Sequence, residues 1–203
     1  MRLILASSSP RRQELLSQLG LKFEVIKPEI DESRREGEDL LGYVRRLSRE
    51  KAEAVVLVLN NSPALIISAD TIVILAADTI GVDEGGDLLG KPADAADARR
   101  MLRRLRGRAH KVITAFTLYH CGERPQVITR HARTVVHMRD FSDAEIDAYI
   151  ATGDPLDKAG AYAIQNEGFH PVARIEGSYS NVVGLPVDEV KTALGEIGFV
   201  SSF

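Results

Sequence analysis

Short apolar runs typical of buried strands alternate with amphipathic stretches typical of helices along the whole chain. The pattern predicts strands at residues 2–6, 23–27, 64–75, 109–119 and 126–139. It predicts helices at residues 10–19, 39–59, 94–106, 143–152 and 187–197. Because strands and helices interleave, we expect an α/β fold with a mixed central sheet flanked by helices.

The length of 203 residues is sufficient for a large core, and we expect one domain over residues 1–203. The consecutive strands at residues 109–139 leave a second arrangement open, in which they form a lobe and the site lies in a cleft between two lobes. Composition, at 44% hydrophobic and 27% charged, excludes a disordered chain and a membrane protein. The single cysteine, Cys121, excludes an intrachain disulfide, and the N-terminus lacks the apolar run of a signal peptide, so we expect a cytoplasmic protein.

The strongest local feature is the segment at residues 5–12, which reads Leu-Ala-Ser-Ser-Ser-Pro-Arg-Arg. A strand that enters a serine-rich turn and then a helix presents free backbone N–H groups and the positive end of the helix dipole. The hydroxyls of Ser7 and Ser9 add donors, and Arg11 and Arg12 add forked cationic donors suited to phosphate. The segment favours phosphate binding, with an ordinary helix cap and surface arginines as the alternative.

Acidic residues occur at three places where carboxylates could carry chemistry. Asp70 follows the apolar residues 64–67, so we expect it at the carboxyl end of a strand, where α/β sheets bind ligands. Burying a lone carboxylate is costly, so Asp70 should be paired, metal-bound or functional. Asp31 and Glu32 suit Mg²⁺ or a general base, although loop acids of this kind are more often simply solvated. Asp78, in a duplicated Ala-Asp-Thr-Ile stretch, is the rival of Asp70.

Lysine is scarce, with only 7 lysines among the 26 basic residues. Lys51, Lys91 and Lys158 lie near acids or in predicted loops. Each alone is most simply a solvated amine, but together they suit a polyphosphate, which requires several cations. Arginines between residues 99 and 108 surround a predicted helix, and we interpret them as a solvated face rather than a nucleic-acid patch. The net charge of −3 also disfavours nucleic acid as a partner.

Small residues are concentrated at residues 159–165 and 177–186. Glycine lets the backbone approach a ligand closely, and the amide of Gln165 suits a base edge, but a tight turn is an equal alternative. The five histidines lack the spacing of zinc ligands, and the chain has no Gly-x-Ser-x-Gly motif. Neither a zinc enzyme nor covalent catalysis is therefore predicted.

These segments together resemble the Maf (septum-formation-type) nucleotide pyrophosphatases. The matching stretches follow the family order and span nearly the whole chain, at residues 5–12, 30–32, 43–47, 51–52, 69–73, 89–92, 107, 110, 153–165 and 176–186. Any one stretch is weak, but the ordered set is highly specific. The chain departs from the family between Asp70 and Lys91, where it is longer than usual, and at Asn166, where the family mostly has glycine. We therefore expect a slightly different loop at Asn166.

The resemblance implies an α/β fold akin to the inosine-triphosphate pyrophosphatases (the Maf/Ham1 fold) and a homodimer. It also implies hydrolysis of nucleoside triphosphates to the monophosphate and pyrophosphate with Mg²⁺ or Mn²⁺. By position, Asp70 resembles the general base that activates water for attack at the α-phosphorus, and Glu32 and Asp70 resemble the metal-binding acids. The residues that resemble phosphate ligands are Ser9, Arg11, Arg12, Lys51 and Lys91.

Three residues match positions linked to base preference in the family. Arg12, Thr71 and Gln165 resemble the branch that acts on dTTP and UTP, rather than the branch that prefers 7-methyl-GTP. Lys51 lies 19 residues before Asp70, close to the usual family spacing, which favours Asp70 over its rival. Two other functions stay open at this stage. One is a non-catalytic regulator of septum formation that binds nucleic acid or protein, and the other is a house-cleaning inosine-triphosphate pyrophosphatase.

Overall fold

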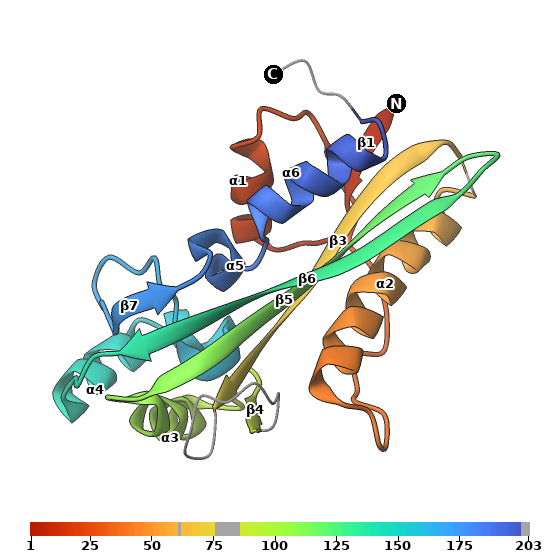
Figure 1. Ribbon diagram of the computed structural model, residues 1–203. Coiled ribbons are helices and arrows are strands. Elements are labelled where there is room, and N and C mark those ends of the chain that lie inside the picture. The colour runs from red at the N-terminus through yellow and green to blue at the C-terminus, as the bar shows by residue number, and fades with distance from the viewer. Residues whose placement is uncertain (61, 76–85, 200–203) are drawn as a thin grey trace. The chain divides into compact units, whose positions relative to one another are not determined.

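The computed structural model describes residues 1–60, 62–75 and 86–199 (Figure 1). The strands are β1 (Arg2–Leu5), β2 (Glu24–Val25), β3 (Ala64–Leu75), β4 (Asp87–Leu89), β5 (Ala109–Cys121), β6 (Gln126–Met138) and β7 (Val172–Glu176). The α-helices are α1 (Pro10–Ser17), α2 (Leu40–Val58), α3 (Ala95–Leu105), α4 (Asp143–Ala151), α5 (Tyr179–Val183) and α6 (Val187–Glu196). Two 3₁₀ helices, η1 (Asp154–Asp157) and η2 (Ala159–Ala161), follow α4.

The strands form one mixed sheet in the order β2-β1-β3-β5-β6-β7, and β4 also pairs with β3. β1 pairs in parallel with β2 and with β3, whereas β4 pairs antiparallel with β3 and β7 pairs antiparallel with β6. The prediction of an α/β fold with a mixed central sheet flanked by helices is confirmed.

Most predicted elements are present, and the differences fall in short or polar segments. α4 begins with a capping box, in which Ser142 Oγ accepts from the amide of Glu145 at 3.2 Å and Glu145 Oε2 accepts from the amide of Ser142 at 2.8 Å. The predicted second strand is reduced to the two residues of β2. The sequence pattern does not predict β4, β7 or α5, because elements of three to five residues are too short to show a period. Within the described ranges, no helix has the length and apolar character needed to span a bilayer.

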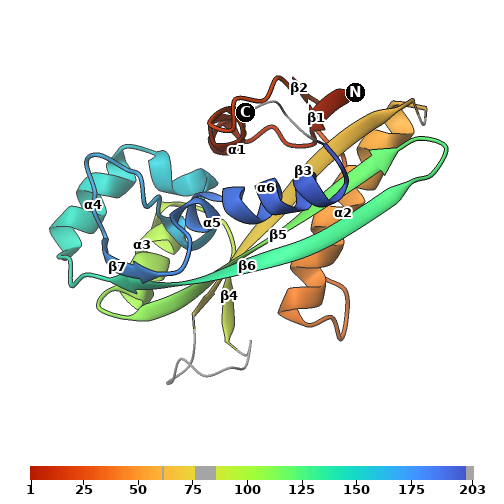
Figure 2. The ribbon, with the colours of Figure 1, turned by 45° about the horizontal axis from the view of Figure 1, so that its top comes forward.

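One compact unit of the chain comprises Met1–Asp70, Thr114–Ala132 and Gly184–Phe203. In this unit α2 covers one side of the strands, and α1 and α6 cover the other side (Figures 1 and 2). An apolar cluster joins Ala52 and Val55 of α2 to Ile66 of β3. Burial of a side chain of this size contributes about 1.5–3 kcal/mol, so the cluster fixes the position of α2 on β3.

The second compact unit comprises Thr71–Ile113 and Arg133–Val183. Its core includes Leu102 of α3, Tyr149 of α4 and Phe169 in the segment before β7. Phe169 stacks on Tyr149, with the ring centroids 4.5 Å apart.

The arginines of and just after α3 are paired with acids in this second unit. The ion pairs are Arg99–Asp147, Arg100–Asp97, Arg103–Asp143, Arg104–Asp87 and Arg106–Asp143. These acids already neutralise the positive charge that a nucleic-acid surface would need. The side chains of these five arginines are 30–71% exposed, which supports the interpretation of this helix surface as a solvated face.

Candidate functional site

The carboxyl ends of β1 and β2 lie level with the middle of β3 in the first unit. Leu5 at the end of β1 is level with Val25 of β2 and with Ile67 of β3. Beyond this level β1 enters the serine-rich turn, and β2 enters the loop that contains Glu32. Asp70 lies three residues beyond Ile67 on β3. This region therefore collects most of the predicted site residues, as expected for an α/β sheet.

The prediction that Asp70 lies at the end of its strand is wrong. β3 continues to Leu75, because β4 pairs with its last residues. What ends before Asp70 is the pairing with β1, whose last partner on β3 is Ile67. Since side chains alternate along a strand, Asp70 shares a face with Ile66 and Ser68, which is the face covered by α2.

Hydrogen bonds from three buried side-chain hydroxyl groups, those of Ser48, Ser68 and Thr117, hold α2 against the sheet beside this face. Ser68 Oγ donates to the carbonyl oxygen of Ser48 at 2.5 Å, and Ser48 Oγ lies 2.6 Å from Thr117 Oγ1 of β5. Thr117 Oγ1 lies in turn 2.9 Å from Thr129 Oγ1 of β6. Residues three apart in a helix lie on one face, so Lys51 faces the same side of α2 as Ser48.

Lys51 joins the two acids that the family resemblance marks as metal-binding. Its Nζ donates to Oδ1 of Asp70 at 2.6 Å and lies 2.9 Å from Oε1 of Glu32. The side chains of Lys51 and Asp70 are 9% and 12% exposed, whereas that of Glu32 is 61% exposed. Pairing with the ammonium offsets part of the free energy needed to desolvate the Asp70 carboxylate.

The two carboxylates also suit a divalent cation of the Mg²⁺ type. Oxygens of Glu32 and Asp70 converge on one cationic group, the ammonium of Lys51. Mg²⁺ commonly takes one or two carboxylates and completes its shell with water and substrate phosphates. In the part of the chain that the structure describes, no group of three or more His, Cys, Asp or Glu residues is arranged to hold a metal ion. The other ligands of such a cation would therefore be water or substrate oxygens.

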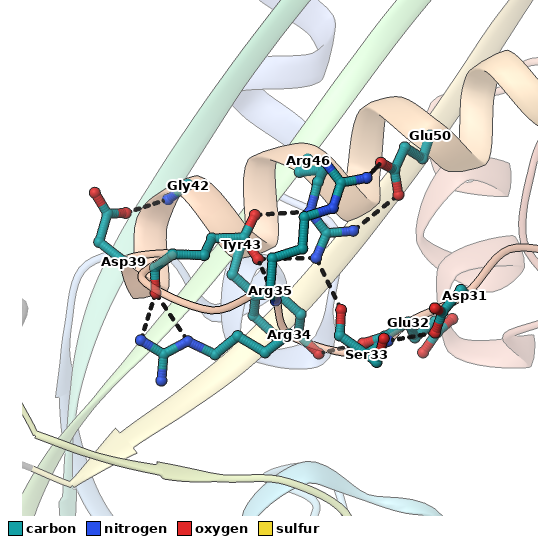
Figure 3. A network of polar contacts seen from close by, with 11 residues as sticks. Asp31, Glu32, Ser33, Arg34, Arg35, Asp39, Gly42, Tyr43, Arg46 and Glu50 are labelled. Carbon is teal, nitrogen blue, oxygen red and sulfur yellow. Dashed lines mark hydrogen bonds and ion pairs between the residues drawn. The ribbon is translucent and has the colours of Figure 1, made fainter.

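Hydrogen bonds from Arg46 of α2 hold the loop that contains Glu32 against this helix (Figure 3). Its guanidinium donates to both carboxylate oxygens of Glu38 at 2.7 and 2.9 Å, and to the carbonyl oxygen of Ser33 at 3.0 Å. A further bond of 2.9 Å joins Arg46 to Glu50. The hydrogen bonds from Arg46 lower the pKa of Glu38 to about 2. The loop is thus held to the same helix that carries the central lysine.

The neighbouring acids Asp31 and Glu32 have different roles in this loop (Figure 3). Asp31 Oδ1 accepts from the amide of Ser33 at 2.9 Å, and this hydrogen bond lowers the pKa of Asp31. Tyr43 OH donates to the carbonyl oxygen of Glu32 at 2.8 Å. Asp31 therefore stabilises the local turn, while the side chain of Glu32 reaches Lys51.

The serine-rich turn forms a helix start as predicted. Ser9 is the N-cap of α1 and Pro10 begins the helix, although Ser9 makes no side-chain capping bond. The buried hydroxyl of Ser7 accepts from the amide of Ser9 at 3.2 Å. Ser7 thus helps to set the backbone of the turn.

Arg12 on the first turns of α1 lies within electrostatic reach of the acids. Its Nε donates to the carbonyl oxygen of Gly184 at 2.8 Å. Burial lowers the pKa of Arg12 and repulsion by Arg11 adds to this effect, while the charges of Asp70 and Glu32 oppose it. The charges of Asp70, Glu32 and Arg11 therefore all act on the guanidinium of Arg12.

Three predicted site residues belong to the second unit. Thr71 follows Asp70 on β3, and strand alternation directs its side chain to the opposite face. Lys91 is exposed in the segment between β4 and α3, and Gln165 is exposed in a turn after η2. Asp78 lies outside the described residues.

Lys158, which the sequence pattern groups with the polyphosphate-binding lysines, has a structural role. Its buried Nζ donates to the carbonyl oxygen and to Oδ1 of Asp154 at 2.6 and 2.7 Å, and to Oδ1 of Asp157 at 2.6 Å. These contacts use all three N–H groups of the ammonium. The structure therefore does not support phosphate binding by Lys158.

The sequence pattern does not indicate a role for Arg46 or for Ser48. The i,i+4 spacing of Arg46 and Glu50 could have indicated an ion pair on α2. The bonds from Arg46 to Glu38 and from Ser68 to Ser48 carry no local signal, because they depend on how the loop and the helix pack.

Known proteins resemble this chain over nearly all of its length. A family model described as "Maf-like protein" matches residues 2–197. A protein of Geotalea uraniireducens named dTTP/UTP pyrophosphatase is 49% identical over 198 residues, which cover 98% of this chain and 96% of that protein. A protein of the same name from Chromobacterium violaceum is 48% identical over 198 residues, with coverage of 98% and 96%. Among solved structures, the Staphylococcus aureus Ham1 protein has a TM-score of 0.49 at 14% identity, covering 97% of this chain and 100% of that chain. The family model and the close relatives show that the chain belongs to the Maf-like protein family.

Proposed function

We propose that the protein hydrolyses dTTP and UTP to the nucleoside monophosphate and pyrophosphate. Relatives named dTTP/UTP pyrophosphatase support this substrate class. The observation that carries the proposal is the convergence of Glu32 and Asp70 on the ammonium of Lys51. Glu32 lies in the loop that follows the carboxyl end of β2, where α/β sheets bind ligands.

Asp70 is the general base in this proposal. Its carboxylate takes a proton from a water molecule, whose oxygen forms a bond to the α-phosphorus. The bond from the α-phosphorus to the oxygen that bridges the β-phosphorus breaks, and pyrophosphate leaves. A well-placed general base contributes about 10²–10⁴-fold in rate, and Asp70 is held in place by β3 and by Lys51.

Charge neutralisation is the other requirement of phosphoryl transfer, because negative charge is spread over the phosphate oxygens. Lys51 supplies a cation directly beside the base. Glu32 and Asp70 would hold a Mg²⁺ or Mn²⁺ ion, which when bound polarises phosphate oxygens as a Lewis acid. The remaining phosphate ligands that we propose are Ser7, Ser9, Arg11, Arg12 and Lys91.

Base preference is assigned to Arg12, Thr71 and Gln165. The amide of Gln165 offers one acceptor and two donors, which suits the edge of a pyrimidine base. It is exposed in a turn of the second unit.

The family resemblance also favours a homodimer, and the single cysteine of the sequence favours a cytoplasmic location. Light scattering of the purified protein tests the first of these, with a mass near twice 22.2 kDa as the expected result. A mass of one chain at micromolar concentration would contradict it.

Pyrophosphate release over a panel of triphosphates tests the proposed function. The panel contains dTTP, UTP, CTP, dATP, GTP, ITP and 7-methyl-GTP, each with Mg²⁺ and with Mn²⁺. We expect the highest kcat/KM for dTTP and UTP. Preferential turnover of ITP would indicate a house-cleaning enzyme instead. No turnover across the panel, together with salt-sensitive DNA binding, would indicate a non-catalytic regulator.

A further inference from the structure

The turn at residues 163–166 contains Gln165, and hydrogen bonds connect both of its ends to the carboxylate of Asp154. Asp154 Oδ2 accepts from Tyr149 OH at 2.8 Å and from Nδ2 of Asn166 at 2.9 Å. Tyr149 OH also accepts from the amide of Ala163 at 3.2 Å. Ala163 and Asn166 are the first and last residues of the turn, so both of its ends lead to the same carboxylate oxygen.

Asp154 is itself held firmly in place. Its Oδ1 and its carbonyl oxygen accept from the buried ammonium of Lys158. Burial alone would raise the pKa of Asp154, but the hydrogen bonds from Lys158, Tyr149 and Asn166 outweigh this effect and lower it. The carboxylate is therefore a fixed, charged acceptor at neutral pH.

Asn166 uses both ends of its side-chain amide. While Nδ2 donates to Asp154, Oδ1 accepts from the amides of Gly168 at 3.0 Å and Phe169 at 2.8 Å. Its own amide donates to the carbonyl oxygen of Ala163 at 3.3 Å, which closes the turn. One side chain thus links the turn, the segment after it and the Asp154 anchor.

Gln165 is exposed at the third position of this turn, while the residue directly after it is locked by four hydrogen bonds. An amide that reads a base binds more tightly when its backbone is already ordered, because less conformational entropy is lost on binding. Asn166 stands where the family resemblance leads one to expect glycine, which has no side chain to make these bonds.

We propose that Asn166 is a positioning residue that presets Gln165 for recognition of the pyrimidine base, an inference that rests on the proposed function. Asn166 does not touch the reacting phosphates in this account. Loss of its side chain should therefore raise KM for dTTP and UTP and leave kcat nearly unchanged. It should also reduce discrimination against the other triphosphates, since Gln165 then samples several positions.

A double-mutant cycle tests whether Asn166 acts through Gln165. We expect Asn166→Ala to raise KM for dTTP about tenfold with kcat within twofold, the size of effect typical of losing about one well-made hydrogen-bonded contact. Gln165→Ala should raise KM at least as much, and Gln165→Ala/Asn166→Ala should match Gln165→Ala alone. Asn166→Asp keeps the acceptor for Gly168 and Phe169 but places a second carboxylate against Asp154, so it should behave like Asn166→Ala.

The matched control is Glu167→Ala, which removes an exposed neighbouring side chain and should leave KM within twofold of the wild type. Additive effects in the double mutant, or a fall in kcat at constant KM, would overturn the positioning role while leaving the proposed function intact. A wild type that hydrolyses neither dTTP nor UTP would overturn the proposed function, and this inference with it. Hydrogen exchange at the amides of Gly168 and Phe169 shows whether each Asn166 variant has lost the anchor without global unfolding.

Discussion

Nζ of Lys51 lies 2.6 Å from Oδ1 of Asp70, and the two side chains are buried together between α2 and β3. The pair depends on two independent packing features. The apolar cluster under α2 positions the helix on β3, and the hydrogen bond from Ser68 to Ser48 positions the turn of α2 from which Lys51 projects.

Replacement of Lys51 should destabilise the protein, because it leaves the Asp70 carboxylate buried without its cation. We expect Lys51→Met to lower the free energy of unfolding by about 3 kcal/mol. Removal of one partner of a buried ion pair usually costs about 3–5 kcal/mol. Urea denaturation at pH 7 measures the change. The matched control is Lys22→Met, at an exposed lysine, which should change the free energy by less than about 0.5 kcal/mol. Equal effects of the two substitutions would show that the buried pair contributes nothing.

Loss of Arg46 should release the loop that contains Glu32. Arg46→Met removes the bonds to Glu38 and to the Ser33 carbonyl, so we expect a fall of about 2 kcal/mol in the free energy of unfolding and faster proteolytic cleavage within residues 33–38. If Glu32 binds the catalytic cation, the Mg²⁺ concentration for half-maximal activity should also rise several-fold.

Arg49→Met is the matched control for this loop. Arg49 forms an exposed ion pair with Glu53 on the same helix rather than with the loop that contains Glu32. This variant should keep both the protease resistance and the Mg²⁺ requirement of the wild type. Loop cleavage at the same rate in both variants would contradict the assignment of the anchor to Arg46.

Acid should destabilise the protein through His110, a buried residue of β5. Its Nε2 lies 2.7 Å from the hydroxyl oxygen of Tyr162, and its Nδ1 has no hydrogen-bond partner among the described residues. Burial lowers the pKa of His110 to about 3. Between pH 6.5 and 3 the unfolded chain therefore binds a proton that the folded chain does not, so stability falls as pH falls, by about 1.4 kcal/mol per pH unit from this group.

Urea denaturation of His110→Gln at pH 7, 6 and 5 checks this dependence. The substitution removes the titrating group, so the slope between pH 6 and pH 5 should be smaller than in the wild type by about 1.4 kcal/mol per unit. His170→Gln, at an exposed histidine, should keep the wild-type slope. A wild-type slope in His110→Gln would show that other groups carry the acid sensitivity.

Local signals in the sequence account for much of the fold. The Ser142–Glu145 capping box and the Ser9–Pro10 helix start appear where the residues predict them. The sequence pattern predicts a strand over residues 64–75, which are the observed bounds of β3. The expectation that Asp70 lies at the carboxyl end of this strand is wrong, because the strand continues and pairs with β4.

Contacts between distant residues explain what the sequence pattern leaves open at the candidate site. Lys51 and Asp70 are identified by residue type and family position, but their 2.6 Å contact depends on how α2 docks. The structural role of Lys158 and the anchoring of Asn166 depend in the same way on the position of Asp154. Residue types in the sequence predict which side chains could bind phosphate, a metal ion or a proton. The packing of the fold determines which of these side chains form ion pairs within the protein.

In the proposed mechanism, Asp70 activates the water that attacks the α-phosphorus. The most direct test is turnover of dTTP with Mg²⁺ in ¹⁸O-labelled water, comparing wild type with Asp70→Asn and locating the label by mass spectrometry. We expect one ¹⁸O atom in dTMP and none in pyrophosphate, and a rate at least about 100-fold lower for a folded Asp70→Asn. Label in the pyrophosphate would contradict attack at the α-phosphorus. Near-normal turnover by Asp70→Asn, with an inactive Asp78→Asn, would transfer the role of the base to Asp78.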